Sequence, residues 1–183
     1  MTARWQDVEY KSELITDARA QALVTSLERS YSNGRVLLLH LAPTAPDTFS
    51  LASRHDLQGY DHLLATFLRA PSVHAALSEL ALPSAQALPP PYRSIGAFEF
   101  EGALTHALVA GGAYGGAVPE EAARRLSRDF VDCCFDDRRL SVTVFAIQGA
   151  WTDWFYDVAW DGTYLCLDRV ASRWTCLFFT DTD

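Results

Sequence analysis

The sequence predicts an α+β fold in which helices pack on an antiparallel sheet and the last strands form a C-terminal meander. Three observations predict this fold. Four of the five tryptophans lie between Trp151 and Trp174, in a segment rich in the aromatic and branched side chains that favour strands. Residues 36–41 are apolar on both faces apart from His40, as in a central strand covered on each side. Between these two segments, apolar residues recur at helical spacing.

Length and composition are those of one globular domain. The chain has 183 residues, of which 49% are hydrophobic and 21% are charged. We expect a single α+β domain over residues 1–183, in which the proline tract at residues 87–93 would mark any subdomain break. The first residues lack the basic stretch and apolar run of a secretion signal, and no apolar run approaches the about 20 residues of a membrane helix. These features predict a cytoplasmic protein without membrane contact.

The net charge of −8 is concentrated towards the end of the chain. Residues 151–183 contain six acidic and two basic residues, so half of the net charge lies in less than a fifth of the sequence. This distribution disfavours nucleic-acid binding, which needs clustered lysine and arginine. It suits a basic protein partner, although a negative balance is also a common route to solubility.

The first elements follow from periodicity and turn residues. Apolar residues at helical spacing predict a helix over residues 16–31, which Asn33 and Gly34 end. The strand at residues 36–41 follows, and prolines end it. Residues 44–58 show no clear period and are expected to form a surface loop.

The next segment is predicted to be helical. An i, i+3, i+4, i+7, i+8 stripe of apolar residues predicts an amphipathic helix over residues 60–68. Pro71 then opens a second helix. After the proline tract, a strand is expected near Ile95, and the alternation of phenylalanine and glutamate at residues 98–101 predicts a half-buried strand. Residues 104–109 are expected to be helical.

A glycine cluster at residues 111–116 precedes another predicted helix, which begins at Pro119. A phosphate-binding loop is disfavoured because Glu120 and Glu121 occupy the first helical turn, where they would repel a phosphate. We expect a flexible connection between two helices. The following helix is expected to bury one side, which consists of Ala122, Leu126, Phe130 and Cys133.

The C-terminal meander is predicted to contain about four strands. The first covers residues 140–147. If Asp161 and Gly162 form a two-residue hairpin turn, Trp160 pairs with Thr163. A further three-residue turn at 170–172 would place Cys166 opposite Cys176.

Two carboxylates come together in this register. Asp157 and Asp168 would lie diagonally on neighbouring strands, roughly 7–8 Å apart, on a face that also carries aromatic side chains. An aromatic setting can raise one carboxyl pKa and so supply an acid and a base for a small hydrolase. Alternatively, the two carboxylates pair with Arg124, Arg125 or Arg128 from a covering helix, or cap turns at the rim.

The sequence predicts neither a metal nor a cofactor. The four cysteines show no zinc-ligand spacing and are expected to be reduced, buried thiols. The five histidines form no metal-binding motif, and no nucleophile-elbow serine is present.

Three functions are compatible with the sequence. The first is a non-enzymatic, immunity-like or adaptor-like protein that binds a basic partner through an acidic, aromatic C-terminal surface. The second is the hydrolase with Asp157 and Asp168, and the third is a structural subunit that self-associates. The binding surface is predicted to consist of Trp151, Asp153, Trp154, Asp157, Tyr164 and Trp174.

Overall fold

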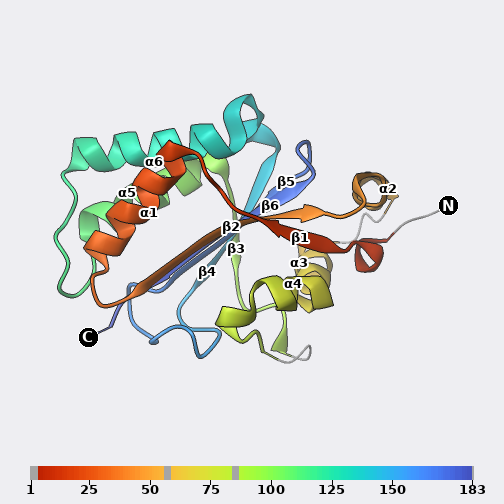
Figure 1. Cartoon of the computed structure of the whole chain (residues 1–183), viewed down its shortest axis with the longest axis horizontal. Coiled ribbons are helices and arrows are strands. Elements are labelled where there is room, and N and C mark those ends of the chain that lie inside the picture. The colour runs from red at the N-terminus through yellow and green to blue at the C-terminus, as the bar shows by residue number, and fades with distance from the viewer. Residues whose placement is uncertain (1–3, 56–58, 84–86, 183) are drawn as a thin grey trace.

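An antiparallel sheet runs through the computed structural model of the protein, which describes residues 4–55, 59–83 and 87–182 (Figure 1). Within these residues, six strands pair in the order β1-β2-β6-β5-β4-β3. They are β1 (Tyr10–Glu13), β2 (Arg35–Pro43), β3 (Arg93–Gly96), β4 (Val142–Gln148), β5 (Gly162–Asp168) and β6 (Arg173–Thr180). The α+β class and the C-terminal meander, which is β4-β5-β6, are confirmed, as are the strands expected near residues 36 and 95.

Helices cover both faces of the sheet (Figure 1). One face carries α1 (Ala18–Ser30), α5 (Ala97–Ala110) and α6 (Glu120–Phe135), followed by the 3₁₀ helix η4 (Asp136–Ser141). The other carries α2 (Pro46–His55), α3 (Tyr60–Arg69) and α4 (Pro71–Ala76), with the short 3₁₀ helices η1 (Trp5–Asp7) and η2 (Ser78–Leu80). Because apolar side chains are buried on both faces, the central strands lack the polar alternation of a half-exposed sheet. No described helix is both long and apolar enough to cross a membrane.

The meander has three strands, because the strand expected to end at Trp160, before the Asp161-Gly162 turn, does not form and its residues lie in a loop. β4 pairs directly with β5, with Gln148 opposite Gly162, and residues 149–161 connect them. The predicted Asp161-Gly162 hairpin is therefore wrong. Gly162 is needed for another reason: a Cβ there would lie 2.4 Å from Cζ of Phe179, its partner on β6. The glycine makes room for an aromatic ring across the strands and does not form a turn.

The β5–β6 register differs by one residue from the expected one. Cys166 pairs with Thr175, and Leu165 pairs with Cys176, because the connection has four residues instead of three. A shift of one residue moves a strand's side chains to the opposite face. Cys166 and Cys176 consequently lie in the cores on opposite sides of the sheet, and neither forms a disulfide.

Residues 98–101 belong to α5 and do not form a strand. The buried residues Ala97, Phe100, Leu104 and Leu108 follow a helical period, whereas Phe98 is 61% exposed. The local alternation of phenylalanine and glutamate was too short to distinguish the two periods.

Residues 46–55 form α2 within the segment that was expected to be a loop; residues 56–58 lie outside the described part of the chain. Among the α2 side chains that the structure describes, Phe49 and Ala52 are in the core, where Phe49 packs edge-on against Trp5. Two buried residues give too short an apolar stripe for its period to be recognised.

The glycine-rich connection between α5 and α6 packs closely against the end of α1. The Gly112 amide donates to the Ser30 carbonyl at 3.0 Å, and a Cβ on Gly115 would overlap that carbonyl oxygen. Glycine is needed here for close approach of two backbones. In α6, the buried side is centred on Ala123, Ser127 and Phe130, so that Ala122, Leu126 and Cys133 lie at its half-buried margin. The buried side of α6 is wider than the predicted one because α6 packs against both α1 and α5.

Candidate functional site

The tryptophans of the predicted binding surface are largely internal. Trp174 is fully buried and stacks on Phe67, with ring centroids 3.9 Å apart. Trp154 is 4% exposed, and its indole N–H donates to Oε1 of Glu79 at 3.0 Å. Trp151 is half-buried and donates to Oγ1 of Thr163 at 2.9 Å. Trp154 and Trp174 therefore contribute to the core, and Trp151 is partly accessible.

The structure does not bring Asp157 and Asp168 together. Asp157 is exposed in the 149–161 loop. The amides of its neighbours Tyr156 and Val158 donate to Thr180 at the end of β6 and to Asp161 just before β5. Asp168 is the last of the seven residues of β5, which extend about 20 Å. Their predicted diagonal contact depended on a strand that ends at Trp160, which does not form.

Asp168 has a structural role, the alternative to a role in an acid and base pair. It is fully buried, accepts from Nε of Arg138 at 2.9 Å and accepts the backbone amides of Val170 and Ala171. It therefore pairs with an arginine and caps the β5–β6 turn, although this arginine follows α6 in η4.

The acidic C-terminal surface is smaller than the composition suggested. Asp161, Asp168 and Asp181 are buried and hydrogen-bonded within the protein. Asp183 lies outside the described residues. The exposed carboxylates among residues 151–182 are Asp153 and Asp157, both in the 149–161 loop.

Side chains fasten the 149–161 loop to the sheet. Asp161 accepts the Val158 amide at 3.1 Å and the Thr180 hydroxyl of β6. The Tyr156 amide also donates to Thr180 Oγ1, at 3.3 Å. Trp154 and Phe155 are buried on one side of the sheet, whereas Trp160 packs on the other. The loop thus wraps around the end of the sheet where β4 ends and β5 begins. These contacts fix the position of its exposed residues.

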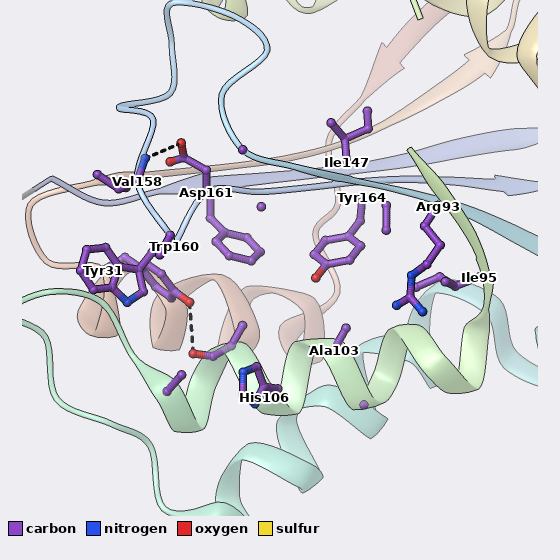
Figure 2. Close-up of a pocket in the computed structure, with 18 of the residues that line it drawn as sticks. Tyr31, Arg93, Ile95, Ala103, His106, Ile147, Val158, Trp160, Asp161 and Tyr164 are labelled. Atoms are coloured by element: carbon purple, nitrogen blue, oxygen red, sulfur yellow. Dashed lines mark hydrogen bonds between the residues drawn. The ribbon is translucent and has the colours of Figure 1, made fainter. Parts of the chain in front are cut away.

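A cleft of about 790 Å³ lies between this loop and α5 (Figure 2). The loop contributes Val158, Ala159 and Trp160 to its wall, and Tyr164 of β5 points towards α5 from the sheet. Tyr31 closes one end, where its hydroxyl donates to the Ala107 carbonyl at 3.1 Å. Among the predicted surface residues, Tyr164 lines this cleft.

Small side chains of α5 form the floor of the cleft. Residues four apart lie on one side of a helix. Two such rows face the cleft, namely Glu99, Ala103, Ala107 and Gly102, His106, Ala110. Four of these six residues are glycine or alanine, so the helix leaves space that larger side chains would fill.

Polar groups are placed at the rim and within the wall. Arg93 and Glu99 form an exposed ion pair at 2.5 Å, and His106 is exposed on α5. Burial raises the pKa of the Tyr164 hydroxyl above its ordinary value, and the neutral hydroxyl can donate a hydrogen bond. An apolar lining with a few convergent polar groups is typical of a binding site.

Sequence reasoning did not identify the α5 side of this cleft. The signal was present in the small residues Gly102, Ala103, Ala107 and Ala110, which lie on one side of a helix. Assigning residues 98–101 to a strand placed Glu99, the first residue of one row, outside the helix.

The described residues include no group of three or more histidine, cysteine, aspartate or glutamate side chains arranged to hold a metal ion. Comparisons with protein-family models, with curated proteins and with solved structures found no match to this chain.

Proposed function

We propose that this protein is a non-enzymatic protein-binding domain whose cleft between α5 and the 149–161 loop receives an apolar segment of a basic partner. The lining of the cleft carries the proposal. Glycine and alanine on α5 leave space for side chains from outside, and Trp160 and Tyr164 face that space. Tryptophan and tyrosine are enriched among the residues that dominate interface energetics.

Charge supports a basic partner. The protein carries a net charge of −8, and the loop beside the cleft exposes Asp153 and Asp157. Arg93 at the opposite rim is paired with Glu99, which reduces its effect on an approaching cation. Such a charge distribution increases the association rate with a basic protein and makes the rate sensitive to salt.

The anchoring of the loop supports a preformed surface. Hydrogen bonds of Asp161 and Thr180 and burial of Trp154 hold the loop before any partner binds. A surface that needs little ordering on association loses less conformational entropy, which favours affinity.

A cleft-filling variant tests the proposal. Proteins that copurify with the tagged protein from its own cells are identified by mass spectrometry, then purified and titrated by calorimetry. Ala103→Leu fills the cleft and is expected to weaken binding of a basic partner at least ten-fold. The matched control is Ala75→Leu, which enlarges an exposed alanine of α4 on the other side of the sheet and should bind as the wild type does.

Two results would overturn this proposal. One is equal affinity of Ala103→Leu and Ala75→Leu for the purified partner, with both variants folded by circular dichroism. The other is recovery of a second copy of this chain or a small molecule as the sole occupant.

A further inference from the structure

Two adjacent cysteines near the end of α6 lie outside the cleft and have no part in the proposed function. Cys133 and Cys134 have their sulfur atoms 3.9 Å apart. Cys133 is half-buried, whereas Cys134, Cys166 and Cys176 are buried. Cys133 is thus the most accessible of the four thiols.

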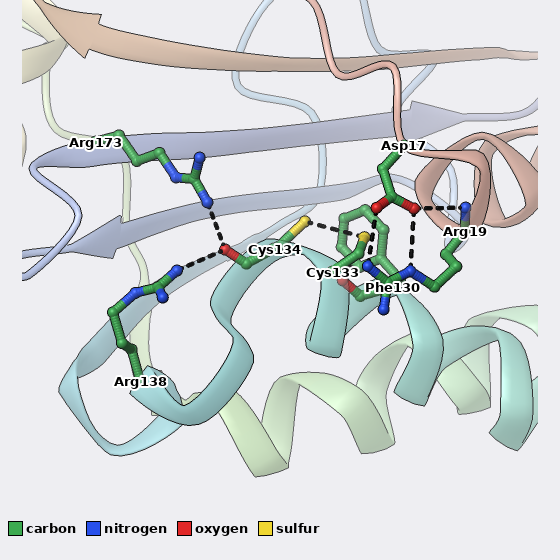
Figure 3. A network of polar contacts seen from close by, with 7 residues as sticks. All are labelled: Asp17, Arg19, Phe130, Cys133, Cys134, Arg138 and Arg173. Carbon is green, nitrogen blue, oxygen red and sulfur yellow. Dashed lines mark hydrogen bonds and ion pairs between the residues drawn. The ribbon is translucent and has the colours of Figure 1, made fainter.

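The surroundings of Cys133 combine groups from two helices (Figure 3). Its sulfur lies beside the first turn of α1, where Asp17 is the N-cap and Arg19 follows. Arg19 is exposed and pairs with Asp17 at 2.9 Å. Asp129, one turn earlier on α6, also interacts with Arg19. The sulfur therefore faces the Arg19 guanidinium and the Asp17 carboxylate.

Local hydrogen bonds favour ionisation of Cys133. The hydrogen bond from Cys134 is the main cause that lowers the pKa of the Cys133 thiol below its ordinary value of 9.0. Arg19 and the Ala20 backbone amide act in the same direction, against burial and Asp17. The pKa of Cys134 is raised, so this thiol keeps its proton and serves as the donor. In the neutral form, Cys133 instead donates to the Phe130 carbonyl at 3.1 Å.

We propose that Cys133 is a modification site for peroxide-class oxidants, with Cys134 as the neighbouring thiol in contact with its sulfur. A half-buried thiol beside a helix N-terminus and an arginine is the arrangement typical of reactive cysteines. The Cys133 sulfur attacks one peroxide oxygen, a sulfur–oxygen bond forms and the oxygen–oxygen bond breaks. The sulfur is oxidised by two electrons to a sulfenate, while the other oxygen leaves as hydroxide and is protonated to water.

Cys134 does not resolve this product in the native helix. Consecutive Cα atoms are about 3.8 Å apart, below the about 4.4 Å at which disulfides begin to be found. The guanidiniums of Arg138 and Arg173 also hold the Cys134 carbonyl, the latter at 2.7 Å (Figure 3). The sulfenate therefore persists until an external thiol reacts with it.

Trapping with dimedone tests the proposal on the full chain. The protein is treated with one equivalent of hydrogen peroxide, then with dimedone, and the adduct is located by peptide mass spectrometry. The adduct is expected on Cys133 and should be absent in Cys133→Ser. Arg19→Gln should lower the rate of Cys133 alkylation by iodoacetamide at pH 7 two- to five-fold. Arg29→Gln is the matched control, because it removes an exposed arginine from the other end of α1.

Three outcomes would overturn the proposal. The first is oxidation of Cys166 or Cys176 before Cys133 in the folded protein. The second is a Cys133 alkylation rate no faster than that of the same residue in urea at the same pH. The third, which contradicts the role given to Cys134, is a disulfide with a mass loss of 2 Da instead of the dimedone adduct.

Discussion

At the scale of single residues, the contact between Gly162 and Phe179 restricts position 162 to glycine. The phenyl ring occupies the space that a side chain at position 162 would need. The pairing of these residues also fixes the register between β5 and β6.

Gly162→Ala is expected to destabilise the protein by about 1–3 kcal/mol, because the added methyl group overpacks against the ring. Chemical denaturation measures this change in the free energy of unfolding. In the double variant Gly162→Ala/Phe179→Leu, the loss should be smaller than the sum of the single losses by at least about 0.5 kcal/mol. Additive losses would mean that the ring does not restrict position 162.

His40 gives the stability a specific pH dependence. It is buried on β2, and its Nδ1 lies 3.0 Å from the Thr175 hydroxyl. Burial, followed by the charge of Arg173, lowers the pKa of His40 from 6.5 to about 4, while Glu13 and the Trp174 backbone act in the opposite direction. Between these two pKa values the unfolded chain binds a proton that the folded protein does not bind.

Stability should consequently fall as pH decreases from about 6.5 to about 4, by up to about 3 kcal/mol for this residue. Urea denaturation of the wild type and of His40→Gln across this pH range measures the effect. The variant should show a shallower dependence of the free energy of unfolding on pH. Equal slopes for the two proteins would contradict the assignment to His40.

At the scale of elements, α5 combines a buried side with a cleft-facing side of small residues. Gly102 lies in the middle of this helix, and a Cβ built on it would meet no atom within 4 Å. The helix therefore retains a glycine where packing does not require one.

Gly102→Ala is expected to stabilise the protein by about 0.5–1 kcal/mol, because alanine has the higher helix propensity. Thermal or urea unfolding measures the gain. The same methyl group projects into the cleft, so binding of the proposed partner should weaken. A destabilised variant would show that position 102 has no free space.

The 149–161 loop shows how polar contacts can override β propensity. Residues 151–160 contain tryptophan, phenylalanine, tyrosine and valine, and these residue types favour strands. In the structure, Asp161 bonds to Val158 within the loop, and the aromatic side chains are divided between the two faces of the sheet. Burial of these side chains therefore does not require strand pairing.

At the scale of the whole molecule, Asp181 connects three segments that are distant in sequence. It is fully buried and accepts the amides of Asn33 at 3.2 Å, Ala113 at 2.9 Å and Thr182 at 3.0 Å. Its carboxylate thereby joins the end of β6 to the segment after α1 and to the glycine-rich connection.

Asp181→Ala should lower the free energy of unfolding by about 2–4 kcal/mol, because buried amides lose their acceptor. Asp153→Ala, which removes an exposed carboxylate, serves as the control and should change stability by less than about 0.5 kcal/mol. Both values come from urea denaturation at pH 7. Similar values for the two variants would contradict the connecting role of Asp181.

Part of the candidate site could be predicted from the sequence. Tyr164 was selected from its aromatic segment and does line the cleft, and the loop that contains Asp153 and Asp157 does reach the surface. Trp154 and Trp174 were selected for the same reason, but they are buried under helices of the other half of the chain. An aromatic residue has the same local signal in a core and in an interface, so composition does not distinguish these environments.

The sequence by itself determined the α+β class, the helices at α1, α3, α4 and α6, and the strands of β2, β3 and the meander, because hydrophobic periodicity and turn residues act over a few neighbouring positions. Only the tertiary structure decided that Gly162 lies against Phe179, that Asp168 pairs with Arg138, and that α5 and the 149–161 loop enclose a cleft. Each of these features depends on residues distant in sequence, whose contacts are fixed by how the helices pack on the sheet.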